Sequence, residues 1–125
     1  MTSMKRILVV EDTLDNRRIL RDLFTSAGFE VIEAANGSDG IEAALRHQPD
    51  VILMDMQLPG IDGYEATRRI KARPETCRIP VVAVTAYALS GDEAKARAAG
   101  CDGYVAKPYS PRQMLGTLHT LTSRA

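Results

Sequence analysis

Residues 51–63 read VILMDMQLPGIDG, and this stretch decides how the whole chain can fold. Four apolar residues, Val51 to Met54, come directly before the acid Asp55, and residues rich in glycine and proline follow. A short apolar run that ends in turn residues is typical of a strand that helices cover on both faces. The stretch therefore predicts a buried central strand with Asp55 at its carboxyl end.

Four other short runs, rich in apolar and β-branched residues, share this pattern: 7–10, 29–32, 80–84 and 104–106. Stretches with the apolar spacing of helices lie between them, so strand and helix alternate five times, with 125/5 = 25 residues per unit. Strands joined by right-handed crossovers run parallel in one open sheet. The prediction is an α/β fold of the (βα)5 type, a doubly wound sheet of five parallel strands. Its second strand, FEVIE, alternates in polarity and is expected at an edge.

Two sequence patterns predict where the last two helices begin. Ser90 with Glu93, and Ser110 with Gln113, have the spacing of a capping box, in which a hydroxyl accepts a backbone hydrogen bond from three residues later. The last helix then reaches nearly to the end of the sequence. We therefore expect a single domain over residues 1–125 and no separate output domain.

The composition excludes several classes of protein. Sixteen basic and sixteen acidic residues cancel, so the chain lacks the positive field that gathers nucleic acid or an anionic membrane surface. The hydrophobic fraction of 45% and the charged fraction of 26% are those of a globular domain. Two cysteines, Cys77 and Cys101, are too few for a disulfide framework or a zinc site. Because no apolar run near the amino terminus has the length of a signal or membrane segment, we expect a cytoplasmic protein.

Polar residues follow four of the five apolar runs: Glu11 and Asp12, Asp55, Thr85 and Lys107. The carboxyl ends of parallel strands meet at one edge of the sheet, which is where ligands bind in such folds. Taken singly, each residue also has a purely structural explanation, as a helix cap, a turn residue or a solvated charge. Together, three close carboxylates would repel one another by about 4 kcal/mol per pair at an effective dielectric constant near 20. The cluster therefore requires positive charge.

Lys107 can offset one of these charges, and a metal ion can offset the others. Carboxylate oxygens without histidine or cysteine nearby suit Mg²⁺, whereas the regular acidic spacing of a calcium loop is missing from the sequence. Such a site, beside a hydroxyl and an ammonium group, suits the transfer of a phosphoryl group to a carboxylate. Asp55 is the predicted nucleophile, and Thr85 would donate a hydrogen bond to the phosphoryl group. Glu11 and Asp12 would hold the metal directly or through water.

These residues resemble the receiver domains of two-component response regulators, and the resemblance covers essentially the whole chain. The residues that carry it are Glu11-Asp12, Asp55-Met56-Gln57-Leu58-Pro59-Gly60, Asp62-Gly63, Thr85-Ala86 and Lys107-Pro108. The resemblance implies the strand order 2-1-3-4-5. Further residues, the run VVAVTA at 81–86 above all, are similar to those of single-domain receivers that regulate cell division.

The resemblance also implies how a metal ion would be bound. Asp55 would accept the phosphoryl group and, together with Asp12, would bind Mg²⁺ or Mn²⁺ directly. Glu11 would bind the ion through a water molecule, and Gln57 would bind it through its backbone carbonyl.

A conformational switch is implied as well. Thr85 and Lys107 would contact the phosphoryl group, and Lys107-Pro108 would be a cis peptide. Tyr104 would turn inward as Thr85 moves toward the phosphoryl oxygens, which would alter the surface of the fourth helix, fifth strand and fifth helix. The donor would be a phosphohistidine on a sensor histidine kinase or a histidine phosphotransfer protein, docked near the first helix. A downstream protein would read the altered surface of a monomer or of a dimer formed on activation.

Two other functions stay open. A small aspartyl phosphatase would need an acid two residues after Asp55, where the chain has Gln57. A receiver-shaped binding module that never accepts phosphate would fit the same fold, although such modules commonly lose one of the five site residues that this chain keeps. We expect a signalling protein that takes part in its own phosphorylation and dephosphorylation, and not an enzyme with separate substrates.

Overall fold

Strands and helices alternate strictly along the part of the chain that the structure, a computed structural model, describes: residues 4–86 and 91–122. In these two segments the elements are β1 (Arg6–Val10), α1 (Leu14–Ser26), β2 (Glu30–Ala34), α2 (Gly37–His47), β3 (Val51–Asp55), α3 (Gly63–Lys71), β4 (Val81–Thr85), α4 (Asp92–Ala99), β5 (Gly103–Ala106) and α5 (Pro111–Thr122). The predicted (βα)5 pattern is therefore confirmed. Asp55 and Thr85 are the last residues of their strands, rather than the first residues after them.

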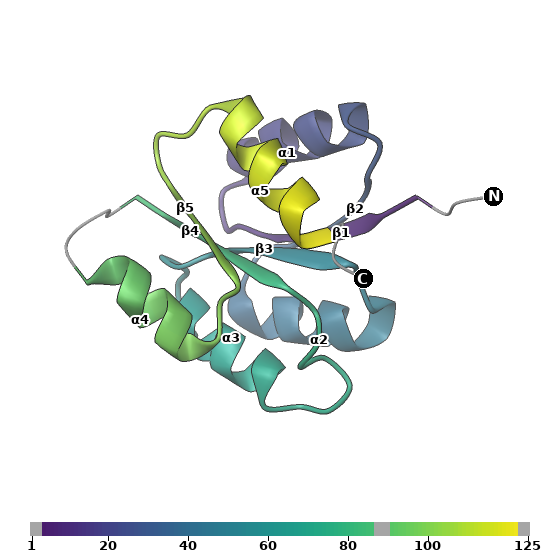
Figure 1. Cartoon of the computed structure of the whole chain (residues 1–125). Coiled ribbons are helices and arrows are strands. Elements are labelled where there is room, and N and C mark those ends of the chain that lie inside the picture. The colour runs from purple at the N-terminus through teal and green to yellow at the C-terminus, as the bar shows by residue number, and fades with distance from the viewer. Residues whose placement is uncertain (1–3, 87–90, 123–125) are drawn as a thin grey trace.

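The five strands of these segments form one parallel sheet in the order β2-β1-β3-β4-β5, as the resemblance implied (Figure 1). In its register, Asp55 of β3 lies beside Val84 of β4, and Thr85 lies beside Ala106 of β5. Because all strands point the same way, the loops that follow β1, β3, β4 and β5 leave from one edge of the sheet. The predicted edge position of β2 is also confirmed.

Two helical layers cover the sheet, with α1 and α5 on one face and α2, α3 and α4 on the other (Figure 1). Alternate residues of each central strand enter separate clusters: Val9 and Leu53 pack with Phe24 of α1, whereas Leu8 and Ile52 belong to the cluster on the opposite face. Burial of each such side chain stabilises the fold by about 2 kcal/mol. Both faces need apolar residues, and this need explains the nearly continuous apolar runs of the sequence.

Local hydrogen bonds define where several helices begin. The Asp62 side chain accepts a hydrogen bond from the Glu65 N–H at the start of α3, and the Ser110 hydroxyl accepts one from the Gln113 N–H at 3.1 Å. The predicted start of α4 was wrong by one residue, because Gly91, and not Ser90, is its N-cap. Ser90 itself lies outside the described residues. In the described segments, no helix has both the length and the apolar character to cross a membrane.

Candidate functional site

Three acidic side chains meet at the edge of the sheet where β1 and β3 end. One carboxylate oxygen of each residue lies within 4.8 Å of the others, for Glu11, Asp12 and Asp55. Glu11 and Asp55 are buried, with exposed fractions of 4% and 5%, whereas Asp12 is exposed at the mouth of the site. The structure thus brings together the three predicted acids and leaves one of them open to solvent.

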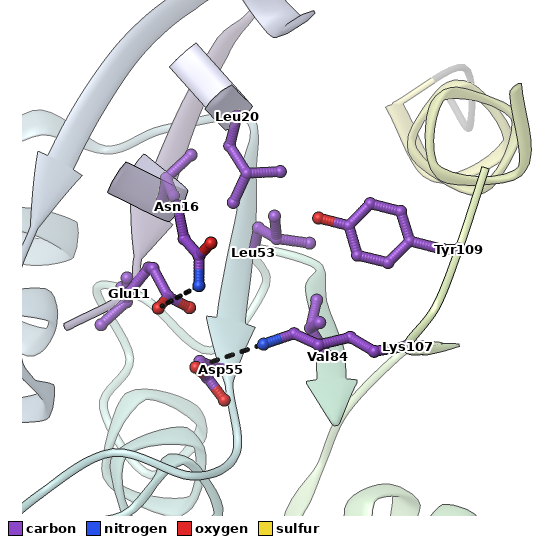
Figure 2. Close-up of a pocket in the computed structure, with 10 residues that line it drawn as sticks. Glu11, Asn16, Leu20, Leu53, Asp55, Val84, Lys107 and Tyr109 are labelled. Atoms are coloured by element: carbon purple, nitrogen blue, oxygen red, sulfur yellow. Dashed lines mark hydrogen bonds and ion pairs between the residues drawn. The ribbon is translucent and has the colours of Figure 1, made fainter. Parts of the chain in front are cut away.

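The Lys107 side chain reaches this cluster from the loop after β5. Its Nζ atom lies 3.9 Å from Oδ2 of Asp55, the contact that Figure 2 marks with a dashed line. This is a charge contact at the limit of an ion pair rather than a short hydrogen bond. The lysine therefore offsets part of the negative charge and leaves room around the carboxylate. The Lys107–Pro108 peptide bond is cis.

Hydrogen bonds fix the two buried carboxyl groups. Oε1 of Glu11 accepts from the Thr13 N–H at 3.2 Å. It also accepts from the Asn16 side-chain amide at 3.2 Å, the bond that Figure 2 marks. Oδ1 of Asp55 accepts from the Gln57 N–H at 2.9 Å. Each carboxyl group is thus held through one of its oxygens by the turn that follows its own strand. Sequence reasoning missed Asn16, although an amide on the first turn of the helix after an acidic loop is a signal that could have found it.

The two buried carboxyl groups influence each other's ionisation. Burial, together with the neighbouring Glu11 carboxyl, raises the pKa of Asp55 to about 7. Burial alone would also raise the pKa of Glu11, but its interactions with Asp55, Asn16 and Thr13 lower that pKa below its usual value. Of the two, Asp55 is the carboxyl group whose ionisation is disfavoured, and the Lys107 ammonium offsets only part of the negative charge of the pair. The site is therefore short of positive charge.

The donor atoms of the cluster indicate which metal would fit. Among the residues that the structure describes, the group able to hold a metal consists of Glu11, Asp12 and Asp55, so every side-chain donor is an oxygen. Such a donor set suits a hard divalent ion such as Mg²⁺, which prefers one or two carboxylates and keeps several waters. The exposure of Asp12 leaves space for those waters. The residues present fit the ion that the sequence predicts.

A small cavity of about 130 Å³ adjoins the acids on the side of α1. Its lining includes Asn16 and Leu20 of α1, Leu53 of β3, and Tyr109 from the loop after β5 (Figure 2). Burial, followed by the charges of Glu11 and Asp55, raises the pKa of the Tyr109 phenol, so the tyrosine stays neutral at the rim. The apolar walls limit hydration of the carboxyl groups and contribute to the perturbed ionisation described above.

The side chain of Gln57 joins β3 to β4 on the other side of Asp55. Its Nε2 atom donates to the Thr85 hydroxyl at 2.9 Å, and its Oε1 atom accepts from the Ala86 N–H at 3.0 Å. Only the backbone carbonyl of this residue was predicted to take part in the site. The signal that could have revealed the side-chain role is the place of Gln57 two residues after the end of β3. There its amide lies opposite the Thr85 hydroxyl, which ends the neighbouring strand β4.

The predicted switch residues lie on adjacent strands. Thr85 is fully buried at the end of β4, and Tyr104 is half-buried on β5 beside Ala83. Tyr104 packs against the core cluster on the face that α2, α3 and α4 cover. The structure therefore places Tyr104 beside the strand that carries Thr85, on the face of the sheet that α2, α3 and α4 cover.

Comparison with known proteins gives a consistent result. Residues 7–119 match the response regulator receiver domain family. The polar-differentiation response regulator DivK of Brucella anthropi is 42% identical over 114 residues, which is 91% of this chain and 93% of that protein. DivK of Brucella ovis is 41% identical with the same coverage.

Solved structures share the fold at high similarity. The receiver domain of a sensor histidine kinase from Pseudomonas aeruginosa superposes on this chain with a TM-score of 0.90 and 36% identity. The match covers 98% of this chain and 100% of that one. That structure has a magnesium ion coordinated in its active-site cleft. A chemotaxis response regulator of Vibrio cholerae has a TM-score of 0.89 and 26% identity over 95% of this chain and 99% of that one. The chain thus belongs to the response regulator receiver domains, the signalling proteins of two-component systems.

Proposed function

We propose that this receiver accepts a phosphoryl group on Asp55 in a reaction that depends on Mg²⁺, and that the modified domain signals through contact with another protein. The observation that carries the proposal is the approach of three carboxylates within 4.8 Å, with the Lys107 ammonium 3.9 Å from Asp55. A cluster with this charge is stable only with added positive charge, and a phosphoryl group needs the same charge to approach a carboxylate.

The proposed reaction transfers the phosphoryl group from a phosphohistidine to the aspartate. An oxygen of ionised Asp55 attacks phosphorus, the new O–P bond forms, and the N–P bond of the donor breaks. The electron pair of that bond stays on the imidazole nitrogen, which can take a proton from solvent. Lys107 stabilises the phosphoryl oxygens electrostatically, and the Thr85 hydroxyl donates to one of them.

Asp12 and Asp55 would bind Mg²⁺ directly, Glu11 would bind it through water, and the Gln57 carbonyl would supply a further oxygen. The ion would contribute positive charge that neutralises the carboxylates and the incoming phosphoryl oxygens. Mn²⁺ accepts the same oxygen donors and would serve in its place. The magnesium ion in the cleft of the Pseudomonas aeruginosa receiver supports this assignment.

The proposed signal leaves the site through β4 and β5. Phosphorylation adds about −1.5 to −2 charges, which would draw the Thr85 hydroxyl toward the phosphoryl group. Tyr104 on the neighbouring strand would then occupy the space that the threonine leaves, so the surface of α4, β5 and α5 would change. A downstream protein would bind this surface of the monomer or of an activated dimer.

A surface for the phosphoryl donor lies beside the acids. Among the described residues, the exposed large hydrophobic side chains are Met4, Leu14 and Ile19, and two of these lie on α1. Leu14 begins α1 directly after the loop that carries Asp12. Exposed apolar residues next to a reactive site favour contact with a partner, so we propose that a histidine kinase or a histidine phosphotransfer protein docks here. Within this proposal the domain spans residues 1–125 and works in the cytoplasm, where the free thiols of Cys77 and Cys101 stay reduced.

The test is phosphorylation by a small donor. The protein is incubated with acetyl phosphate or phosphoramidate, with and without Mg²⁺, and its intact mass is measured beside that of Asp55→Asn. The expected result is a gain of one phosphoryl group that requires both Mg²⁺ and Asp55. No adduct with either donor would instead support the binding module that never accepts phosphate, and multiple turnovers of a phosphomonoester would support the aspartyl phosphatase.

A further inference from the structure

We infer that Arg17 is a positioning residue for the metal site: its guanidinium fixes the loop that carries Glu11 and Asp12 and leaves their carboxylates available to the ion. The contacts that support this inference are direct. Nη1 of Arg17 donates to the backbone carbonyl of Glu11 at 2.8 Å and to that of Asp12 at 3.2 Å. The inference rests on the Mg²⁺ binding proposed above.

Hydrogen bonds connect the loop of residues 11–13 to the first turn of α1, near Arg17. The Arg17 N–H donates to the Thr13 carbonyl at 3.0 Å, which forms the first hydrogen bond of the helix. The Thr13 N–H in turn donates to the Glu11 carboxylate at 3.2 Å. The loop of residues 11–13 is therefore hydrogen-bonded both to the backbone of α1 and to the guanidinium of a residue on that helix.

A second anchor keeps the guanidinium away from the acidic carboxylates. Nε of Arg17 lies 3.4 Å from Oε1 of Glu33 on β2, and the two side chains are 16% and 26% exposed. Arg21, one turn later on α1, lies 3.3 Å from the other Glu33 oxygen. An arginine that formed a bidentate pair with a metal-binding carboxylate would occupy the atoms that the ion needs. Glu33 balances the charge of Arg17 while the metal ligands stay open.

This arrangement matters because Mg²⁺ requires nearly octahedral geometry at short distances. A loop that must first become ordered binds its ligand more weakly than a loop that is already ordered. Loss of a group that orients metal ligands typically reduces affinity 10- to 100-fold. The Coulomb effect has the opposite sign, since removal of a positive charge near the site should strengthen the binding of a cation. A loss of affinity can therefore be assigned to positioning.

The experiment measures Mg²⁺ affinity with MgCl₂ alone, by calorimetry and by NMR titration of the amide signals of residues 11–13. The variants are Arg17→Met, Arg17→Lys and the matched control Arg21→Met, which removes the other partner of Glu33. We expect Arg17→Met to bind Mg²⁺ about tenfold more weakly or worse. Arg17→Lys should also bind weakly, because lysine lacks the planar fork. Arg21→Met should bind as tightly as the wild type or more tightly.

Thermal melting of the same variants separates this effect from a loss of fold. Wild-type affinity in a folded Arg17→Met would overturn the inference, as would an equal weakening in Arg21→Met. If Arg17→Met does not fold, Arg17→Lys decides by the same criterion. A wild-type protein that binds no Mg²⁺ would overturn both this inference and the proposed metal site. A wild-type protein that binds Mg²⁺ but accepts no phosphoryl group would refute only the proposed phosphorylation and would leave the role of Arg17 in place.

Discussion

The side-chain amide of Gln57 donates to the hydroxyl of Thr85 at 2.9 Å, and this hydrogen bond connects the ends of β3 and β4 directly beside Asp55. The same amide accepts a hydrogen bond from the Ala86 N–H at 3.0 Å. Both bonded groups belong to the segment that the proposed switch must move. Gln57 thus connects the turn after β3 to the end of β4, and it lies only two residues after Asp55 along the chain.

Replacement of Gln57 by methionine keeps the volume of the side chain and removes both hydrogen bonds. A hydrogen bond of this kind contributes about 1 kcal/mol net, or about a fivefold change in an equilibrium. We expect the Ala86 amide of Gln57→Met to exchange with deuterium at least about fivefold faster than in the wild type. Gln113→Met on the exposed side of α5 is the control and should leave this rate unchanged. Unchanged protection of Ala86 in Gln57→Met would show that the amide does not hold this segment.

Gly63 is predicted to be irreplaceable, because α3 begins directly against the strand end that carries Asp55. A Cβ atom at this position would lie 2.2 Å from the Asp55 carbonyl oxygen and 2.6 Å from Cα of Met56, both of them backbone atoms. We expect Gly63→Ala to lower the free energy of unfolding by about 3 kcal/mol, measured by urea denaturation. Gly116→Ala is the matched control, since a Cβ there meets nothing within 4 Å on α5. It should raise stability by up to about 1 kcal/mol, and equal effects of the two substitutions would contradict this explanation.

The exposed side chain of Ile19 allows the donor surface to be tested separately from the chemistry. Its exposed fraction is 64%, so Ile19→Glu should leave the fold and the reaction with acetyl phosphate intact. Transfer from any phosphohistidine protein that phosphorylates the wild type should slow at least tenfold, because a charge would replace an apolar contact. Met4→Glu is the control, since Met4 is 57% exposed but lies before β1, at the opposite end of the sheet. If both variants accept the phosphoryl group from the protein donor at the wild-type rate, the donor surface lies elsewhere.

The two thiols should differ strongly in reactivity. Cys77 is exposed, whereas Cys101 is buried with its sulfur 3.8 Å from the Thr67 hydroxyl. Burial raises the pKa of Cys101, so the reactive thiolate is scarce even at pH 8. A disulfide reagent should modify one thiol per chain rapidly and the second only as the protein unfolds. Cys77→Ser should abolish the rapid phase, and rapid modification of this variant would show that the cluster around Cys101 opens in the folded state.

The alternation of strands and helices could be predicted from sequence because it depends on local periodicity. The continuous apolar run that ends at Asp55 also indicated a strand buried on both faces, and the rule for parallel strand ends indicated where the acids would meet. The order of the strands came from the family resemblance, since periodicity does not tell which strands are neighbours. The start of α4 was missed because Gly91 takes a left-handed backbone conformation, with φ of +96°, directly before the helix.

The contacts that sequence reasoning missed depend on where a side chain points, and they join residues that are not adjacent in the sequence. Gln57 and Thr85 are 28 positions apart, and a pattern of apolar residues does not indicate where an amide points. Arg17 entered no prediction from the sequence, yet its guanidinium bonds to backbone carbonyls five and six residues earlier. Contacts of this kind become visible only when the loop and the helix have been placed together.

The division of the core by the sheet has a consequence for how such a domain can diverge. Residues beneath α1 and α5 pack in one cluster, and residues beneath α2, α3 and α4 pack in the other. The sheet separates the two clusters. Substitutions on the two sides share few neighbours, and their effects on stability should add independently. The proposed donor surface on α1 and the α4 part of the proposed output surface therefore rest on different clusters, so one can diverge with little effect on the packing of the other.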